Sequence, residues 1–278
     1  MKKLFLPAVI AGICLTAKAQ VNMPQPSPTQ TIVQNFGLGK IALEYSRPSI
    51  KGRTLFEENS DLAPLGKIWR TGANAATRLT FSDFVNFGGK DLDTGSYALF
   101  TIPGKTEWEI ILNKGYNNDG LQNYKESDDV VRFKVPVMER TPATETFTMQ
   151  FHNLRNESCS LNLIWGNVFV SIPITTNIKD RVKAQIEKAL MGNDKPYWQA
   201  ANFYYDWDKN YPKALENVTK ALDENKDGFW IYMLKAKIEA AMGDKANAKI
   251  SAQKCIETAS KAKNDDYVKQ ANLLLQTL

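Results

Sequence analysis

Basic, aromatic and amide side chains gather in one part of the sequence, between residues 47 and 74. The set comprises Arg47, Lys51, Arg53, Lys67, Trp69, Arg70 and Asn74. A guanidinium group presents a planar fork of N–H donors that matches a carboxylate, phosphate or sulfate, and it also stacks on aromatic rings. Tryptophan beside arginine and asparagine is likewise a suitable face for a sugar. The cluster therefore predicts a site for a glycan or a small anion. Pairing with local acids and loop carbonyls is the alternative, and it would make the cluster structural.

The residue types needed for nucleophilic or metal-dependent catalysis are scarce. His152 is the single histidine of the sequence, so any Ser-His-Asp or Cys-His arrangement would have to use it. A zinc site needs several ligands, which one histidine and the distant Cys159 and Cys255 do not supply. We therefore predict no metal, no cofactor and no catalytic residue from these side chains.

Carboxylates leave one enzymatic alternative open. Glu107 and Glu109 share one face of a predicted strand. Two carboxylates can hydrolyse a glycosidic bond when burial raises the pKa of one of them. We interpret Asp128 and Asp129 as solvent-exposed loop acids, because their spacing matches no regular calcium loop.

The N-terminus has the three parts of a signal peptide over residues 1–19. Lys2 and Lys3 precede an apolar stretch, and a small-x-small cleavage site ends at Ala19. The apolar stretch is too short to span a bilayer, and no later segment has the apolar length of a transmembrane helix. The proline-rich residues 20–30 predict a flexible leader. The sequence thus predicts a periplasmic or secreted protein.

Charge argues against a nucleic-acid partner. The formal net charge of +5 falls once the signal peptide is removed, since the remaining chain carries 32 basic and 30 acidic side chains. Neither half of the chain has the basic excess typical of nucleic-acid binding.

The two cysteines outside the signal peptide are interpreted as separate buried thiols.

Residues 31–176 show the two-residue alternation of half-buried strands. Trp108, Ile110 and Leu112 alternate with their neighbours, and turn-forming glycines separate such runs. The segments 159–165 and 168–174 predict a hairpin that turns at Gly166. Roughly eight to ten short strands without intervening helices favour an antiparallel β-sandwich.

Helical periodicity replaces this alternation at residue 177. Residues 177–193 predict a connecting helix that ends near Gly192. Residues 194–278 predict a tetratricopeptide-like array of helical hairpins with a final capping helix. Three pairs of positions recur at the 34-residue tetratricopeptide spacing: Ala214 with Ala248, Ala221 with Cys255, and Leu222 with Ile256.

Several motifs between about residues 28 and 176 carry a resemblance to a known family. They are Arg47-Pro48-Ser49-x-Lys51-Gly52-Arg53, Gly66-Lys67-Ile68-Trp69-Arg70-Thr71-Gly72-Ala73-Asn74-x-x-Thr77, and Gly95-Ser96-Tyr97-Ala98-Leu99-Phe100-Thr101-Ile102-Pro103. This region resembles the exported bacterial family called domain of unknown function 2911. The resemblance implies a β-sandwich and export, and it implies no activity.

Two classes of function follow from these patterns. The first is an exported, non-enzymatic binding or assembly protein whose helical repeats engage a protein or peptide partner. Its β-sandwich would bind a glycan or an anion. The second is a carbohydrate-active enzyme that uses carboxylates of the sandwich, and the convergence of two carboxylates in one cleft would distinguish it.

Overall fold

The computed structural model describes residues 23–278, which divide into two compact units. The sheet unit holds the described residues up to Asn35 together with residues 39–154 and 159–174. The helical unit holds residues 175–278 together with two short stretches, 36–38 and 155–158. The predicted signal peptide and the first residues of the predicted leader lie outside the described residues. The first strand begins at Thr29, inside the segment predicted as leader.

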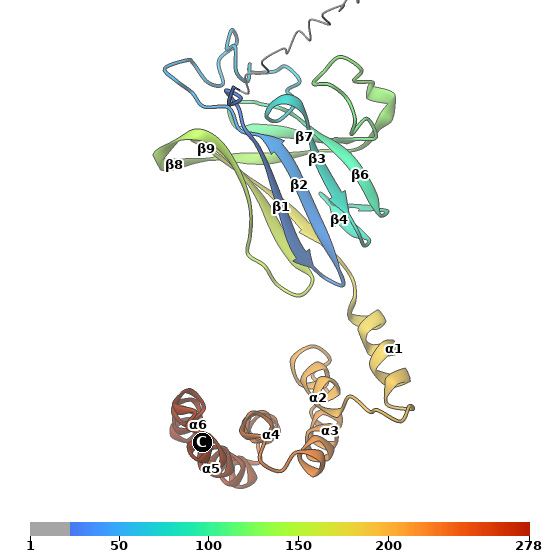
Figure 1. Cartoon of the computed structure of the whole chain (residues 1–278), viewed down its shortest axis with the longest axis vertical. Helices are drawn as coiled ribbons and strands as arrows, with labels where there is room; N and C mark the ends of the chain where they lie inside the picture. Colours follow the sequence, from blue (N-terminus) through green and yellow to red (C-terminus); the bar gives the residue numbers. More distant parts are fainter. Residues whose placement is uncertain (1–22) are drawn as a thin grey trace, which may run out of the picture. The chain divides into compact units, whose positions relative to one another are not determined.

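Nine strands form the sheet unit of the described chain. Figure 1 shows their arrangement. They are β1 (Thr29–Phe36), β2 (Gly39–Ser46), β3 (Ala73–Phe81), β4 (Val85–Phe87), β5 (Lys90–Leu92), β6 (Gly95–Ile102), β7 (Glu107–Asn113), β8 (Asp129–His152) and β9 (Ser158–Thr175). Their order across the sheet is β1-β2-β3-β6-β7-β8-β9-β4-β5. Neighbours such as β2 and β3, β6 and β7, and β8 and β9 pair antiparallel. The short helix η1 (Glu126–Asp128) precedes β8.

The alternation predicted for β7 is confirmed, with one informative departure. Trp108, Ile110 and Leu112 are all buried, but so is Ile111, which points to the other face of the strand. Ile111 belongs to a second small core on that other face. This core comprises the buried Ala76, Ala98, Phe100 and Ile111 and the partly buried Ile68, Ile102, Leu121 and Tyr124. Loop segments around residues 68 and 121 therefore pack on the sheet and are held in place by it.

The hairpin predicted at Gly166 is wrong, because β9 is one continuous strand from Ser158 to Thr175. Gly166 does have a positive φ of 56°. It lies opposite Thr144, at a point where the register between β8 and β9 shifts. The left-handed conformation of this glycine thus accompanies an irregularity in a long strand and does not reverse the chain.

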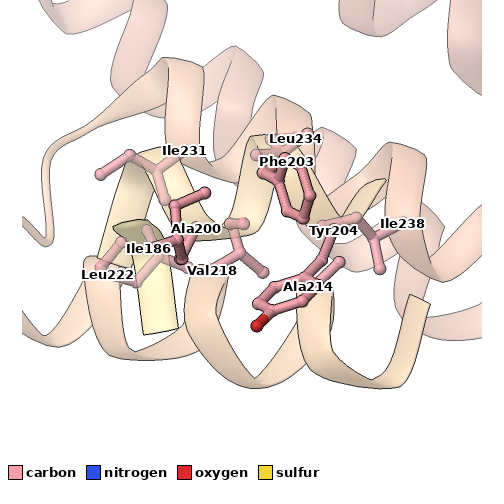
Figure 2. Packing of buried hydrophobic residues seen from close by; sticks show 12 residues of the cluster. Ile186, Ala200, Phe203, Tyr204, Ala214, Val218, Leu222, Ile231, Leu234 and Ile238 are labelled. Carbon is pink, nitrogen blue, oxygen red and sulfur yellow. The ribbon is translucent and has the colours of Figure 1, made fainter. Parts of the chain in front are cut away.

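Six helices follow the strands. They are α1 (Lys179–Ala189), α2 (Tyr197–Asp206), α3 (Tyr211–Glu224), α4 (Phe229–Ala241), α5 (Lys245–Lys261) and α6 (Asp265–Thr277). Side chains from α1 to α4 form the main core of this unit. Figure 2 labels residues of this core from all four helices, among them Ile186 of α1, Tyr204 of α2, Val218 of α3 and Ile238 of α4. Strands followed by helices match the predicted change of period near residue 177.

Burial repeats at two of the three predicted pairs with 34-residue spacing, whereas in the third pair Leu222 is buried and Ile256 only partly buried. Ala214 and Ala248 are both fully buried, and Ala221 and Cys255 are 3% and 0% exposed. The residues that cap α3 and α5 recur at the same spacing. Asn210 accepts from the backbone N–H of Lys213, and Asp244 accepts from that of Asn247. Such caps satisfy otherwise unpaired N–H groups and set where each helix begins.

Two carboxylates hold α1 within the helical unit. The carboxylate of Glu157 accepts from the backbone N–H groups of Ile178 and Lys179, at 2.7 and 2.9 Å. The carboxylate of Asp208 forms ion pairs with the Nζ atoms of Lys179 and Lys183 of α1, at 3.3 and 3.2 Å. A carboxylate at a helix N-terminus is also favoured by the helix dipole. Among residues 23–278, no helix combines the length and apolar character needed to cross a membrane.

Candidate functional site

Asn74 lies at the start of β3, and the loop between β2 and β3 carries the other six predicted ligand-binding residues. This loop is tied to the sheet near both ends, by a bridge between Ser49 and Thr146 and by one between Trp69 and Thr101. The backbone N–H of Trp69 donates to the oxygen of Thr101 at 2.7 Å, and the N–H of Thr101 donates back at 3.0 Å. The loop therefore holds its side chains over a rigid support.

Backbone conformations that L-amino acids rarely adopt are concentrated in this region. Lys51, Phe56, Thr71 and Asn74 have φ between 49° and 58°, and they make up four of the seven such non-glycine residues in the described chain. Each left-handed residue costs on the order of 1–2 kcal/mol, so the surrounding contacts must hold them. Strained backbone conformations of this kind are concentrated at active sites and ligand-binding segments.

Trp69 is part of the core and offers no open face to a sugar. Its side chain is 4% exposed, and its indole N–H donates to the oxygen of Gly72 at 3.0 Å. The ring stacks on Trp165, with centroids 5.6 Å apart, and meets the edges of Trp108 and Phe147. The aromatic cluster therefore forms the floor beneath the loop.

Arg70 is held by its main-chain neighbours. Its Nη1 donates to the backbone oxygen of Asn74 at 2.7 Å. The backbone of Gly120 comes so close to the guanidinium that a Cβ there would lie 2.6 Å from Nη1. The amide of Asn74 donates to the oxygen of Ser27 and to Oγ of Ser46, at 3.1 and 3.2 Å. The side-chain oxygen of Asn74 has no partner among the described residues.

Arg53 is oriented in a similar way. Its Nε donates to the oxygen of Ile50 at 3.1 Å, and its Nη2 donates to the oxygen of Ser49 at 2.6 Å. Neither Arg53 nor Arg70 forms an ion pair within the described residues. By contrast, Arg78 pairs with Glu44 at 3.0 Å, which takes it away from the candidate site.

These residues surround a cleft of about 390 Å³. Of the seven predicted site residues, Arg53, Trp69, Arg70 and Asn74 line it. The other lining residues include Ser27, Pro48, Asp61, Leu62, Pro64, Ile68, Leu121 and Trp165. Asp61 is the one carboxylate in this lining. The cleft thus combines two guanidiniums, a carboxylate and an amide oxygen with apolar walls.

The structure does not bring the other three predicted residues into the cleft. Arg47 donates to the oxygen of Phe147 and to Oγ1 of Thr148, at 3.1 and 2.8 Å, and so ties the loop to β8. Lys51 is exposed, and its backbone N–H donates to the carboxylate of Glu145. Lys67 is exposed and does not line the cleft. For Arg47 the structural interpretation of the cluster holds.

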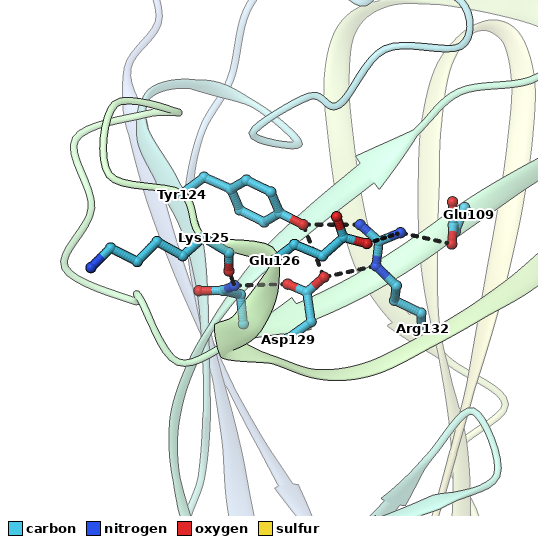
Figure 3. A network of polar contacts seen from close by, with 7 residues as sticks. Glu109, Tyr124, Lys125, Glu126, Asp129 and Arg132 are labelled. Atoms are coloured by element: carbon cyan, nitrogen blue, oxygen red, sulfur yellow. Dashed lines mark hydrogen bonds and ion pairs between the residues drawn. The ribbon is translucent and has the colours of Figure 1, made fainter.

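A polar network that the sequence did not reveal lies at the start of β8 (Figure 3). The side chain of Asp129 is 7% exposed, so its interpretation as a solvent-exposed loop acid is wrong. It accepts from Nε of Arg132 at 2.7 Å, from the hydroxyl of Tyr124 at 2.9 Å and from the amide of Asn113 at 2.7 Å. Burial, foremost, raises the pKa of Tyr124. Since every group here has a partner, the network is structural.

The carboxylates considered for hydrolysis do not line the cleft. Glu109 bonds to Arg132 at 3.3 Å, and Glu107 lies 3.6 Å from Lys134. His152 is exposed on the surface and contacts Asn153. Both described cysteines are free, and burial raises the pKa of each thiol to about 11. No group of three or more metal-ligating side chains occurs among residues 23–278.

A second hollow, of about 370 Å³, lies within the helical unit on α1, α2 and α3. Tyr197 and Tyr204 line it, together with Leu190 and the strongly exposed Met191. Lysines stand over both rings: Lys213 Nζ lies 5.1 Å from the Tyr204 centroid, and Lys220 Nζ lies 5.6 Å from that of Tyr197. Tyrosine and methionine surfaces of this kind are frequent where proteins bind one another.

Comparisons with known proteins place the sheet unit in a family. No curated protein matches the chain. A family model described as "Protein of unknown function (DUF2911)" matches residues 27–174, which is more than half of the chain and includes the whole loop that carries the cleft. The chain therefore belongs to the DUF2911 family.

Proposed function

We propose that this protein is an exported, non-enzymatic binding protein whose sheet unit binds a small anionic or polar ligand in the cleft beside Arg53 and Arg70. One observation carries the proposal. Two guanidiniums line one cleft, each oriented by backbone carbonyls and neither paired with a carboxylate among the described residues. An oriented, unpaired guanidinium binds an anion without first breaking an ion pair.

We further propose that the sheet unit is a β-sandwich and that the helical unit is a tetratricopeptide-like array that engages a protein or peptide. The recurrence of buried positions and helix caps at 34 residues supports the array. The tyrosine-lined hollow on α1, α2 and α3 supports a protein-binding role. Export rests on the tripartite N-terminus, and mass spectrometry of the natural protein should find Gln20 as its first residue.

The ligand-binding role can be tested with simple anions. Phosphate, sulfate and acetate should raise the melting temperature of the full mature protein, because a ligand that binds the folded state stabilises it by mass action. Arg53→Ala and Arg70→Ala should abolish this stabilisation. Arg78→Ala is the matched control, since it removes an arginine that pairs with Glu44 outside the cleft.

Two results would contradict this role. The first is a wild-type protein whose melting temperature no anion or polar sugar changes. The second is equal loss of anion stabilisation in all three variants, because that would place the effect on overall surface charge and not on the cleft.

A further inference from the structure

The polar groups left free in the cleft include acceptors as well as cationic donors. Asp61 has no hydrogen-bond or ion-pair partner among residues 23–278, although it lines the same cleft as Arg53 and Arg70. The side-chain oxygen of Asn74 is a second free acceptor, because its amide nitrogen already donates to Ser27 and Ser46. A bare anion would use the guanidiniums but would leave both acceptors unmatched and would be repelled by Asp61.

The donors that remain free are also well defined. Arg70 uses Nη1 on Asn74, which leaves its Nε and Nη2 without a partner among the described residues. Arg53 uses Nε on the oxygen of Ile50 and Nη2 on that of Ser49, which leaves Nη1. A carboxylate can accept from these nitrogens, and charge-assisted bonds of this kind are the strong ones.

Apart from Ser27 and Ser60, the remaining lining of the cleft is apolar. Leu62, Pro64 and Leu121 supply its apolar walls, and the almost fully buried indoles of Trp69 and Trp165 lie behind them. A volume of about 390 Å³ lies near the lower end of the range for small-molecule sites, so the ligand is small. A pyranose ring has hydroxyl groups around its edge and C–H groups on its faces, and it would use both kinds of surface.

We propose that the cleft binds a sugar acid, a hydroxylated ring that carries one carboxylate. The carboxylate accepts from Arg53 and Arg70, hydroxyl groups donate to Asp61 and to the oxygen of Asn74, and a C–H face packs against the apolar walls. This inference rests on the proposed ligand-binding function and adds the chemical class of the ligand. Asp61 becomes the residue that distinguishes a sugar acid from a simple anion.

The test compares three probes by titration calorimetry on the full mature protein: D-glucuronate, D-glucose and acetate. Glucose has the ring without the carboxylate, and acetate has the carboxylate without the ring. We expect glucuronate to bind at least tenfold more tightly than either. Arg70→Ala, with Arg53→Ala as the second variant should the first fail to fold, should weaken glucuronate binding at least tenfold.

Asp61→Asn supplies the decisive comparison. Loss of its negative charge should leave acetate binding unchanged or strengthen it, whereas it should weaken glucuronate binding. The ratio of glucuronate to acetate affinity should therefore fall at least fivefold. Glu58→Gln is the matched control, because it removes an exposed carboxylate of the same loop that does not line the cleft, and it should leave this ratio unchanged.

The outcomes separate the two proposals. Acetate that binds as tightly as glucuronate overturns the sugar acid and keeps an anion site. Glucose that binds as tightly as glucuronate overturns it in favour of a neutral sugar. An unchanged affinity ratio in Asp61→Asn overturns the assigned role of Asp61 and with it the ligand class. No binding of any probe, together with no stabilisation by phosphate or sulfate, overturns the proposed function itself.

Discussion

Gly120 offers a way to move the Arg70 guanidinium without removing it. The φ of Gly120 is +66°, and a Cβ at this position would lie 2.6 Å from Nη1 of Arg70 and 2.9 Å from its Cζ. Contacts this short force the guanidinium to shift. Because Nη1 donates to the oxygen of Asn74 at 2.7 Å, that hydrogen bond would be lost. Gly120→Ala should therefore disturb the cleft through the position of Arg70.

The expected magnitude follows from a matched glycine. Gly66 has nearly the same φ, +69°, and a Cβ there would meet nothing within 4 Å. Gly66→Ala should cost only the left-handed strain of alanine, ~1–2 kcal/mol. Gly120→Ala should cost the same strain plus the lost charge-assisted hydrogen bond. We take this bond as ~1 kcal/mol, below the usual range, because Arg70 is half-buried. The sum is ~2–3 kcal/mol.

Amide hydrogen exchange on peptides from β6 and β7 is the appropriate assay. It reports the opening of the sheet unit alone, whereas unfolding of a protein with two units is not a single two-state transition. In an Arg70→Ala background there is no guanidinium for the new methyl group to clash with. Adding Gly120→Ala should then lower the stability of the sheet unit by no more than Gly66→Ala does. Additive effects of Arg70→Ala and Gly120→Ala would refute this account of how Arg70 is held.

Two further predictions concern residues outside the cleft. Arg47→Ala should destabilise the sheet unit by ~1–3 kcal/mol, because a charged donor to Phe147 and Thr148 is lost. The affinity of the cleft for anions should not change. Reduced anion affinity with normal stability would contradict this prediction. Burial by itself would raise the pKa of Asp208, but Lys183 and Lys179 outweigh it and lower that pKa. A lowered folded-state pKa stabilises above pH ~3.9, and the gain is lost as the pH falls below this value. Asp208→Asn should therefore lower the melting temperature at pH 7 by about 2–5 °C, and thermal melts should show the difference vanishing near pH 2.

Periodicity predicted the kinds of element well, because burial on one face leaves a regular pattern in the sequence. The alternation around Trp108 and the 34-residue recurrence of Ala214 and Ala248 both correspond to buried positions. The pattern could not show that Ile111 is buried as well. Its cover comes from Ile68 and Leu121, which lie in loops, and loop residues have no period from which their packing could be predicted.

The same limit explains the candidate site. Arg47 and Arg53 lie six positions apart and belong to one motif, yet Arg47 bonds to β8 and Arg53 lines the cleft. Arg47 donates to Phe147 and Thr148, and these two residues are about one hundred positions further along the chain. The burial of Asp129 could not be predicted for a related reason, since its partners Asn113 and Tyr124 approach it from segments outside β8. Residue type predicted which side chains have the chemistry to bind an anion. It could not predict which of them the fold would leave in the cleft without another partner.

Trp69 shows how a residue can serve a site without contributing an open surface to it. Its backbone exchanges two hydrogen bonds with Thr101, so the chain is locally strand-like at this point. In such a segment successive side chains point to opposite sides. The indole of Trp69 enters the core against Trp165, and the guanidinium of Arg70 is thereby directed outward to the cleft. The burial of Trp69 thus removes it as a stacking platform for a sugar, and it also fixes the direction of the arginine on which the proposed site depends.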